Sequence, residues 1–298
     1  MSALHRGAVP LASIAAVAAA LVSTPSSAAA ASFPVINVHE SDHGFTVSGA
    51  TLNRDAGRVT FHFTTTTTNT NNGSDVELLQ IRPGHTFAEA EAAGGGGAAS
   101  PAAAAAGTRA LQSTIHFFGG ANLNLASQSE NITETLYAGT YYLVDLGGQS
   151  AGPPQIVPIH VTGTPSRSAP WPAIGATILV GNGSSDRFKI SGPIPAGSNI
   201  LIRNTADGQT IHFTQFIPIV PGTTDATIQT LLNSNSQAPP PQILGPGFSA
   251  GILSPGTQEV VSSASLTPGT YVLVCFIADD MTGMPHALMG MHLVVTVK

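Results

Sequence analysis

Charge is scarce in this chain of 298 residues. Charged side chains make up 9% of it, and 10 Lys and Arg residues stand against 16 Asp and Glu residues, for a net charge of -6. A typical soluble domain carries about 25% charged residues. Because so few cations cannot neutralise a run of phosphates, the composition excludes nucleic acid as a partner.

Cysteine and long apolar runs are also rare. The single cysteine, Cys275, excludes a disulfide framework within the chain. An apolar run at residues 8–22 follows a basic start and precedes a group of small residues that ends at Ala30. This is the pattern of a secretory signal peptide, and the run falls short of the ~20 residues that a membrane span needs. We therefore expect residues 1–30 to be removed and the mature chain to be secreted or periplasmic, with no membrane span.

Glycine and proline, in contrast, are abundant. The chain contains 32 Gly and 22 Pro among many Thr, Ser and Val residues. Such a composition provides many turns and few strong helix formers. It predicts an all-β protein built from short strands.

The chain that follows the signal peptide repeats itself. Residues 41–49 (SDHGFTVSG) resemble residues 185–192 (SDRFKISG), and residues 136–141 (LYAGTY) resemble residues 266–271 (LTPGTY). These landmarks occur in the same order in both places. A tandem duplication explains them better than chance does.

The repeat predicts two domains of ordinary size. We place the first at residues 31–163 and the second at residues 177–298, joined by a Pro- and Ser-rich linker at residues 164–176. About seven short strands with turns every 8–12 residues predict a Greek-key β-sandwich for each copy.

One short helix is predicted in each copy. The first covers residues 86–93, and the second begins near Thr223 or Thr224, where Asp225 favours the N-terminal end of the helix dipole. Residues 94–106, nearly all Gly and Ala, are predicted to form a loop without regular structure.

Four side chains that can bind a soft metal follow one another in the second copy: His212, Cys275, His286 and Met291. His212 stands on a predicted strand and Cys275 near the end of another, while the last two lie on the loop before the final strand. Such a loop brings its side chains to one pole of a sandwich. A thiolate, two imidazoles and a weak axial thioether are the ligands of a mononuclear blue-copper centre.

The second copy resembles a cupredoxin domain along the whole of residues 177–298. The resemblance is carried by Asn204 ahead of the first histidine, by residues 269–275 (GTYVLVC), and by residues 286–291 (HALMGM) before a Val-rich strand. It implies an exported Greek-key sandwich that binds one copper ion and shuttles electrons.

The resemblance also implies a role for each candidate ligand. His212, Cys275 and His286 would be the equatorial ligands of the copper ion, and Met291 the axial one. The sequence departs from the family pattern in its long spacing between Cys275 and His286, and in Phe213, where the family often has an asparagine.

The first copy does not repeat these ligands. Aligning the landmarks puts Ser74 at the place of His212, Asp145 at that of Cys275, and Gln155 near that of His286. We therefore expect the first copy to hold no metal. The other dense group of ligands, at residues 39–43, does not make a site, because His39 and His43 on one strand would lie about 13 Å apart.

Two functions fit these observations. The first is an exported copper protein that passes single electrons to a redox partner protein or holds copper. The second is a metal-free cupredoxin-like module that binds a partner through its loops. The sequence has no His-x-His or His-Cys-His element of the kind that multicopper oxidases need, so we expect no enzymatic activity. It leaves the oligomeric state open.

Overall fold

The computed structural model describes most of the chain after the predicted signal peptide, which lies outside the described residues. The described residues are 33–66, 74–94, 100–125, 128–146, 155–165, 170–183, 185–234, 240–245, 247–263 and 266–298. Residues 31–298 form one compact unit. Within the described part, no helix has the length and apolar character that crossing a bilayer requires.

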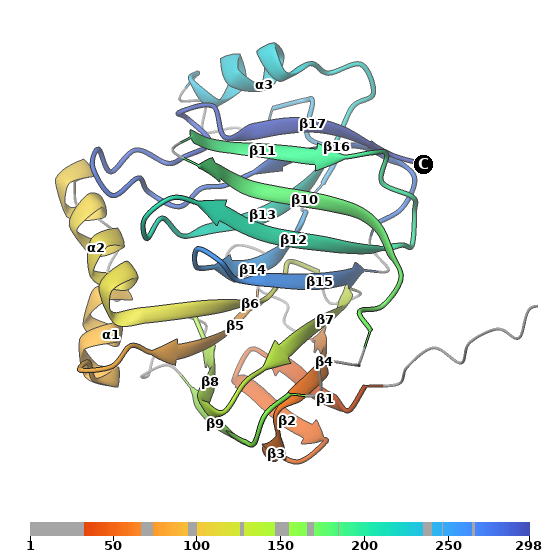
Figure 1. Ribbon diagram of the computed structural model, residues 1–298. Coiled ribbons are helices and arrows are strands. Elements are labelled where there is room, and N and C mark those ends of the chain that lie inside the picture. The colour runs from red at the N-terminus through yellow and green to blue at the C-terminus, as the bar shows by residue number, and fades with distance from the viewer. Residues whose placement is uncertain are drawn as a thin grey trace, which may run out of the picture. The chain divides into compact units, whose positions relative to one another are not determined.

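Two β-sheets make up most of the part of this unit that the structure describes (Figure 1). The strands of the first sheet are β1 (Val35–Ser41), β2 (Gly44–Gly49), β4 (Gly57–Thr65), β7 (Ser129–Leu136), β10 (Ile174–Gly183), β11 (Ser185–Ser191), β12 (Asn199–Ala206) and β15 (Gln258–Ser263). Those of the second sheet are β3 (Asn53–Asp55), β5 (Ser74–Ile81), β6 (Ile115–Leu123), β8 (Gly139–Asp145), β9 (Ile156–Thr162), β13 (His212–Ile219), β14 (Phe248–Leu253), β16 (Gly269–Val274) and β17 (His292–Val297).

The strand order repeats on both sides of a seam. The first sheet runs β11-β10-β12-β15-β7-β4-β1-β2 and the second runs β17-β16-β13-β14-β6-β5-β8-β9-β3. We call residues 33–165 the first half and residues 170–298 the second half. The halves meet where β7 pairs antiparallel with β15 and β6 pairs antiparallel with β14. From these seams outward, corresponding strands follow in the same order, so the sequence repeat is also a topological repeat.

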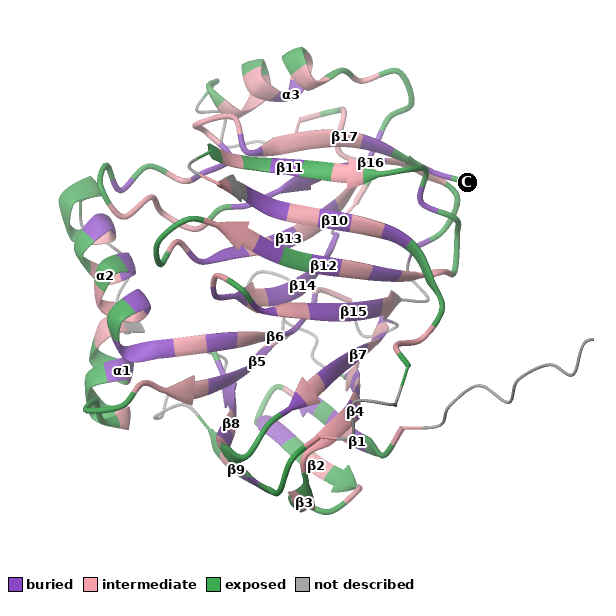
Figure 2. Ribbon diagram, viewed as in Figure 1, coloured by how far each residue is buried: buried purple, intermediate pink, exposed green. Residues whose placement is uncertain are grey.

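The two sheets bury their facing sides in one core. Along β4, Val59, Phe61 and Phe63 are buried and alternate with half-buried residues, as expected of a strand with one face inward. Phe61 of the first sheet and Leu78 of the second belong to the same apolar cluster. Figure 2 shows this alternation along the strands of both sheets. The prediction of an all-β sandwich is confirmed, while the division into two separate domains stays a prediction.

Among the described residues, three helices lie outside the sheets: α1 (Phe87–Gly94), α2 (Pro101–Thr114) and α3 (Asp225–Leu232). The third was predicted correctly. Thr224 caps it by accepting a hydrogen bond from the Thr227 backbone N–H, and its buried Ile228 packs over Val272 and Val274 of β16. The helix predicted at residues 86–93 is α1.

The prediction of a single helix in the first half was wrong. Residues 101–106, expected to be loop, begin the additional helix α2. Ser100 caps it by accepting a hydrogen bond from the Ala103 N–H at 3.2 Å, and Pro101 occupies its first turn. Alanine has the highest helix propensity, so the run that follows the cap extends the helix.

Candidate metal centre

His212 is the first residue of β13 and follows a turn built around a buried asparagine. Asn204 donates from Nδ2 to the backbone oxygens of Thr210 (2.9 Å) and Leu253 (2.7 Å). Its Oδ1 accepts a hydrogen bond from the Ala206 N–H at 2.9 Å. These bonds tie the turn at residues 204–210 to β14, and thereby fix the backbone that presents His212.

Cys275 and His286 come from the loop that connects β16 to β17. Cys275 directly follows β16, and its carbonyl oxygen accepts a hydrogen bond from the Ala287 N–H at 2.7 Å. The His286 N–H donates to the Ile277 oxygen at 2.9 Å. The loop therefore folds back on itself, and this brings the His286 side chain over Cys275.

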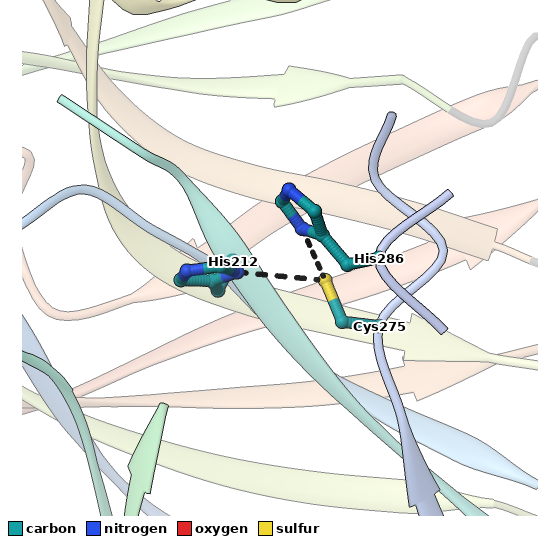
Figure 3. A group of neighbouring side chains, drawn as sticks. All are labelled: His212, Cys275 and His286. Carbon is teal, nitrogen blue, oxygen red and sulfur yellow. Dashed lines mark hydrogen bonds between the residues drawn. The ribbon is translucent and has the colours of Figure 1, made fainter. Parts of the chain in front are cut away.

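The three side chains converge, as Figure 3 shows. Cys275 Sγ lies 3.8 Å from His212 Nδ1 and 3.6 Å from His286 Nδ1. The two imidazole ring centres are 4.8 Å apart. All three side chains are fully buried. One sulfur and two Nδ1 nitrogens thus face a common point inside the protein.

Burial disfavours the charged forms of Cys275 and His286. It raises the pKa of Cys275 to about 12, an effect that backbone N–H groups of Phe213 and Ile277 partly offset by hydrogen bonding to the sulfur. Burial, followed by the neighbouring His212, lowers the pKa of His286 to about 4. At neutral pH the site therefore offers a thiol and an unprotonated His286 imidazole.

Met291 is also fully buried and belongs to the same apolar cluster as Cys275. Its backbone N–H donates to the His286 oxygen at 2.9 Å, so the segment that carries it is folded against the site. Its role as axial ligand stays a prediction.

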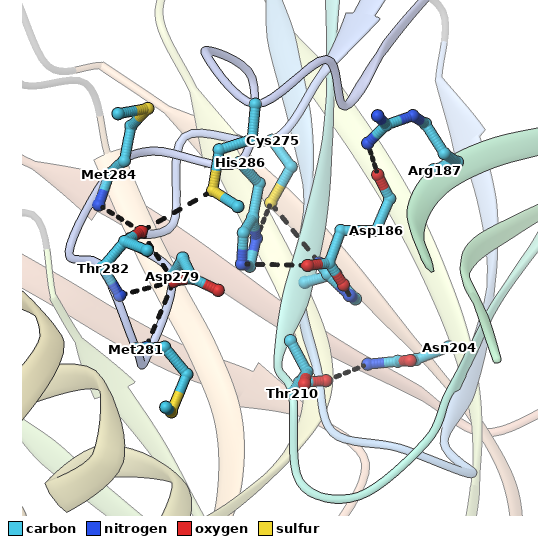
Figure 4. Close-up of polar contacts among 12 residues, drawn as sticks. Asp186, Arg187, Asn204, Thr210, Cys275, Asp279, Met281, Thr282, Met284 and His286 are labelled. Atoms are coloured by element: carbon cyan, nitrogen blue, oxygen red, sulfur yellow. Dashed lines mark hydrogen bonds and ion pairs between the residues drawn. The ribbon is translucent and has the colours of Figure 1, made fainter. Parts of the chain in front are cut away.

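Asp186, which the sequence did not single out, lies beside the far nitrogens of both imidazoles. Figure 4 shows it next to His286. Its two carboxylate oxygens lie 3.3 Å from His212 Nε2 and 3.8 Å from His286 Nε2. Both distances are within ion-pair range, but neither Nε2 atom meets hydrogen-bond geometry with a partner among the described residues. The polar contact with the His212 side chain is the main cause that lowers the pKa of the Asp186 carboxyl group.

Sequence analysis also missed Gly181 of β10. Its backbone has a positive φ of 60°, and a Cβ atom on it would lie 2.9 Å from His212 Nε2 and 2.6 Å from Ala206 Cβ. The His212 ring therefore fits only because this position has no side chain.

The corresponding end of the first half carries other residues at the same register positions. Ser74 pairs with Leu123 as His212 pairs with Leu253. Asp145 follows Val144 in β8 as Cys275 follows Val274 in β16.

Gln155, expected near the position of His286, stands instead at that of Met291. It precedes Ile156, which pairs with Val144, just as Met291 precedes His292, which pairs with Val274. The expectation placed it wrongly because the loops between these strands differ in length.

The donor set of the second half fits a copper ion. A thiolate is a soft ligand that suits Cu(I), and imidazole suits both oxidation states. The two Nδ1 atoms and the sulfur can bind one ion together, and the buried Nε2 atoms face a carboxylate, as ligating histidines usually do. The cluster could thus hold one copper ion.

Fold and site together define a two-sheet β protein with a buried group of one cysteine and two histidines. No protein-family model matches the chain, and no curated protein matches its sequence. Solved structures do show similarity, and each of those named below matches 41% of this chain.

Among them are auracyanin B (21% identity, 86% of that chain, TM-score 0.27) and an auracyanin from the photosynthetic bacterium Roseiflexus castenholzii (22%, 94%, TM-score 0.27). A third is rusticyanin from Thiobacillus ferrooxidans (16%, 75%, TM-score 0.24). At scores this low, function has to be argued from the side chains of the site.

Proposed function

We propose that this chain is an exported copper protein of the cupredoxin type, which holds one copper ion in its second half and passes single electrons. One observation carries the proposal. Cys275 Sγ lies 3.6 Å from His286 Nδ1 and 3.8 Å from His212 Nδ1, and all three side chains are fully buried.

The side chains have distinct tasks in such a centre. Copper supplies the one-electron couple between Cu(I) and Cu(II). Cys275, as a thiolate, and His212 and His286, through their Nδ1 atoms, would hold this ion. The backbone bonds of the turn at residues 204–210 and of the loop at residues 275–291 hold these ligands in place, so that their geometry changes little when the charge of the ion changes.

The experiment that tests the proposal is addition of one equivalent of Cu(II) to the purified protein. We expect an absorption band near ~600 nm, from charge transfer between thiolate and copper. The band should be absent from Cys275→Ser and from His286→Ala, but present in His160→Ala, which changes an exposed histidine of the first half. A colourless protein that keeps a freely titratable thiol in excess copper would support the metal-free module instead.

Export is a separate part of the proposal. Its support is the three-part pattern of residues 1–30. N-terminal sequencing of protein recovered outside the cytoplasm should begin near residue 31. Recovery of the protein with Met1 still attached would contradict export by signal cleavage.

A redox partner protein completes the proposed role. The loop that carries Cys275 and His286 also exposes Phe276 (43%), Met281 (81%) and Met284 (47%). Exposed apolar side chains so close to the site would let a partner exclude water there. Replacing Met281 by Glu should slow electron exchange with the partner and leave the absorption band unchanged.

A further inference from the structure

The motif Ser-Asp opens one matched segment in each half of the repeat, and in the second half its aspartate lies at the candidate copper site. Asp186 is the second residue of β11, the edge strand of the first sheet, whereas the ligands come from β13 and the loop at residues 275–291. Its side chain is 21% exposed, while both imidazoles beneath it are fully buried. The carboxylate therefore stands between the imidazoles and solvent.

The Asp186 carboxylate faces the two imidazoles and, among the described residues, ion-pairs with no Lys or Arg. The neighbouring Arg187 turns instead to the backbone oxygen of Asp186, to which its Nη1 donates at 2.7 Å. The other acid near the site behaves differently. Asp279 Oδ1 accepts hydrogen bonds from the Met281 and Thr282 backbone N–H groups and from the Thr282 hydroxyl. These bonds stabilise the loop that carries Asp279.

The position of Asp186 favours one tautomer of each imidazole. A neutral imidazole carries one proton, and a carboxylate beside Nε2 favours the tautomer with that proton on Nε2. The lone pair is then on Nδ1, which in both rings is the nitrogen that faces Cys275 Sγ. The Asp186 carboxylate thereby favours a free Nδ1 lone pair on both His212 and His286.

We propose that Asp186 is a positioning residue for the copper centre, which holds His212 and His286 in the tautomer that binds through Nδ1 and lowers the reduction potential of the site. The inference rests on the proposed function. A negative charge next to both imidazoles stabilises Cu(II) more than Cu(I), since the attraction grows with the charge of the ion.

The test is the reduction potential of the copper-loaded protein, measured at one pH in the wild type and in Asp186→Asn. We expect the ratio of Cu(II) to Cu(I) affinity to fall about tenfold in Asp186→Asn, which raises the potential by about 59 mV for one electron. Asp186→Glu, which keeps the charge, should recover much of the wild-type potential. Asp42→Asn removes the same charge at the matching motif of the first half, in a turn at the opposite edge of the sheet, and should leave the potential unchanged.

A second measurement needs no metal. Nitrogen NMR of the two histidines in the copper-free protein should show the proton on Nε2 of both rings in the wild type and a mixture of tautomers in Asp186→Asn. An unchanged potential in a blue Asp186→Asn protein, or unchanged tautomers in its copper-free form, would overturn the inference. Absence of the blue band from the wild type would instead defeat the proposed function, and the NMR result would still decide the tautomer.

Discussion

The end of the second half that holds His212 and Cys275 has a counterpart in the first half, where β5, β8 and the start of β9 come together. Both ends are built on corresponding strands that pair in corresponding register. The matched tyrosines even make similar bonds: Tyr141 Oη accepts from the Tyr137 N–H, and Tyr271 Oη donates to the Thr267 oxygen, each at 3.0 Å.

What differs is the side chains that this shared backbone presents. In the second half they are a thiol and two imidazoles. In the first half, the carboxyl group of Asp145 stands at the position of Cys275. Gln155 binds the backbone of β2: its Oε1 accepts from the Phe45 N–H at 2.8 Å, and its Nε2 donates to the Phe45 oxygen at 2.5 Å. The fold therefore provides the same backbone positions in both halves, and the side chains at these positions determine whether a half can bind a metal.

The largest effect is expected when the matched residues Asp145 and Cys275 are exchanged between the two halves. Cys275→Asp should abolish the ~600 nm band, because a carboxylate cannot provide the thiolate transition. The reciprocal change, Asp145→Cys in a Cys275→Asp background, should not restore it, since Ser74 and Gln155 stand where imidazole and thioether would be needed. Absorption after addition of one equivalent of Cu(II) checks both variants. A blue double variant would show that the first half can form the site.

The two halves also differ at a buried position, which is Glu40 in the first half and Val180 in the second. Glu40 pairs with Phe45 and Thr65, and Val180 occupies the matching position opposite Phe188 and Asn204. Glu40 is 3% exposed, and its Oε1 has no hydrogen-bond partner among the described residues. Burial, assisted by Asp75 and Asp145, raises the pKa of Glu40 to about 9.

The sign of the resulting pH dependence follows from this shift. Glu40 stays protonated in the folded protein up to about pH 9, whereas it ionises near pH 4.3 in the unfolded chain. Its contribution to stability is complete below about pH 4 and is lost as the pH rises towards 9.

Glu40→Val should therefore gain stability relative to the wild type as the pH rises, by up to about 1.4 kcal/mol per pH unit. Denaturant unfolding between pH 4 and 9 measures this difference. Glu91→Val, on the exposed face of α1, is the matched control. Parallel stability curves for Glu40→Val and the wild type would contradict the assignment.

The turn before His212 allows a third test. Asn204→Ala leaves the buried oxygens of Thr210 and Leu253 without their donor, which should lower the free energy of unfolding by about 1–3 kcal/mol. Asn199→Ala, which removes a single bond to the Ala173 oxygen in an exposed place, should have a smaller effect. Equal losses in the two variants would mean that Asn204 does not organise the turn.

The smallest expected effect concerns Gly181. Gly181→Ala and Gly197→Ala both place a side chain on a backbone of positive φ (60° and 65°), which costs about 1–2 kcal/mol. Only the first also crowds His212, because a Cβ on Gly197 meets nothing within 4 Å among the described residues. Copper affinity should therefore fall in Gly181→Ala alone. Equal affinities in the two variants would argue against this packing role.

Sequence alone predicts the convergence of His212, Cys275 and His286, because their order along two strands and one closing loop leaves few other arrangements. It predicts α3 as well, from the Thr224 cap and the apolar face that follows. Both depend on local patterns, which survive folding. Ser100 and Pro101 could have indicated the start of α2. The helix was not predicted, because the Gly- and Ala-rich composition around these residues is more typical of a loop.

Asp186 and the seam between the halves depend on long-range pairing. Asp186 reaches the imidazoles from an edge strand far from both in sequence, and no spacing rule connects them. The pairing of β6 with β14 likewise joins strands whose own sequences do not specify a partner. The repeated Ser-Asp motif was the one hint, and it gave no reason to prefer Asp186 over Asp42.

X-ray absorption at the copper edge tests the central claim most directly. On the wild-type protein loaded with one copper per chain, we predict scattering from a single short sulfur neighbour and two imidazole rings. Coordination by nitrogen and oxygen alone, with the thiol of residue 275 still protonated, would contradict the account.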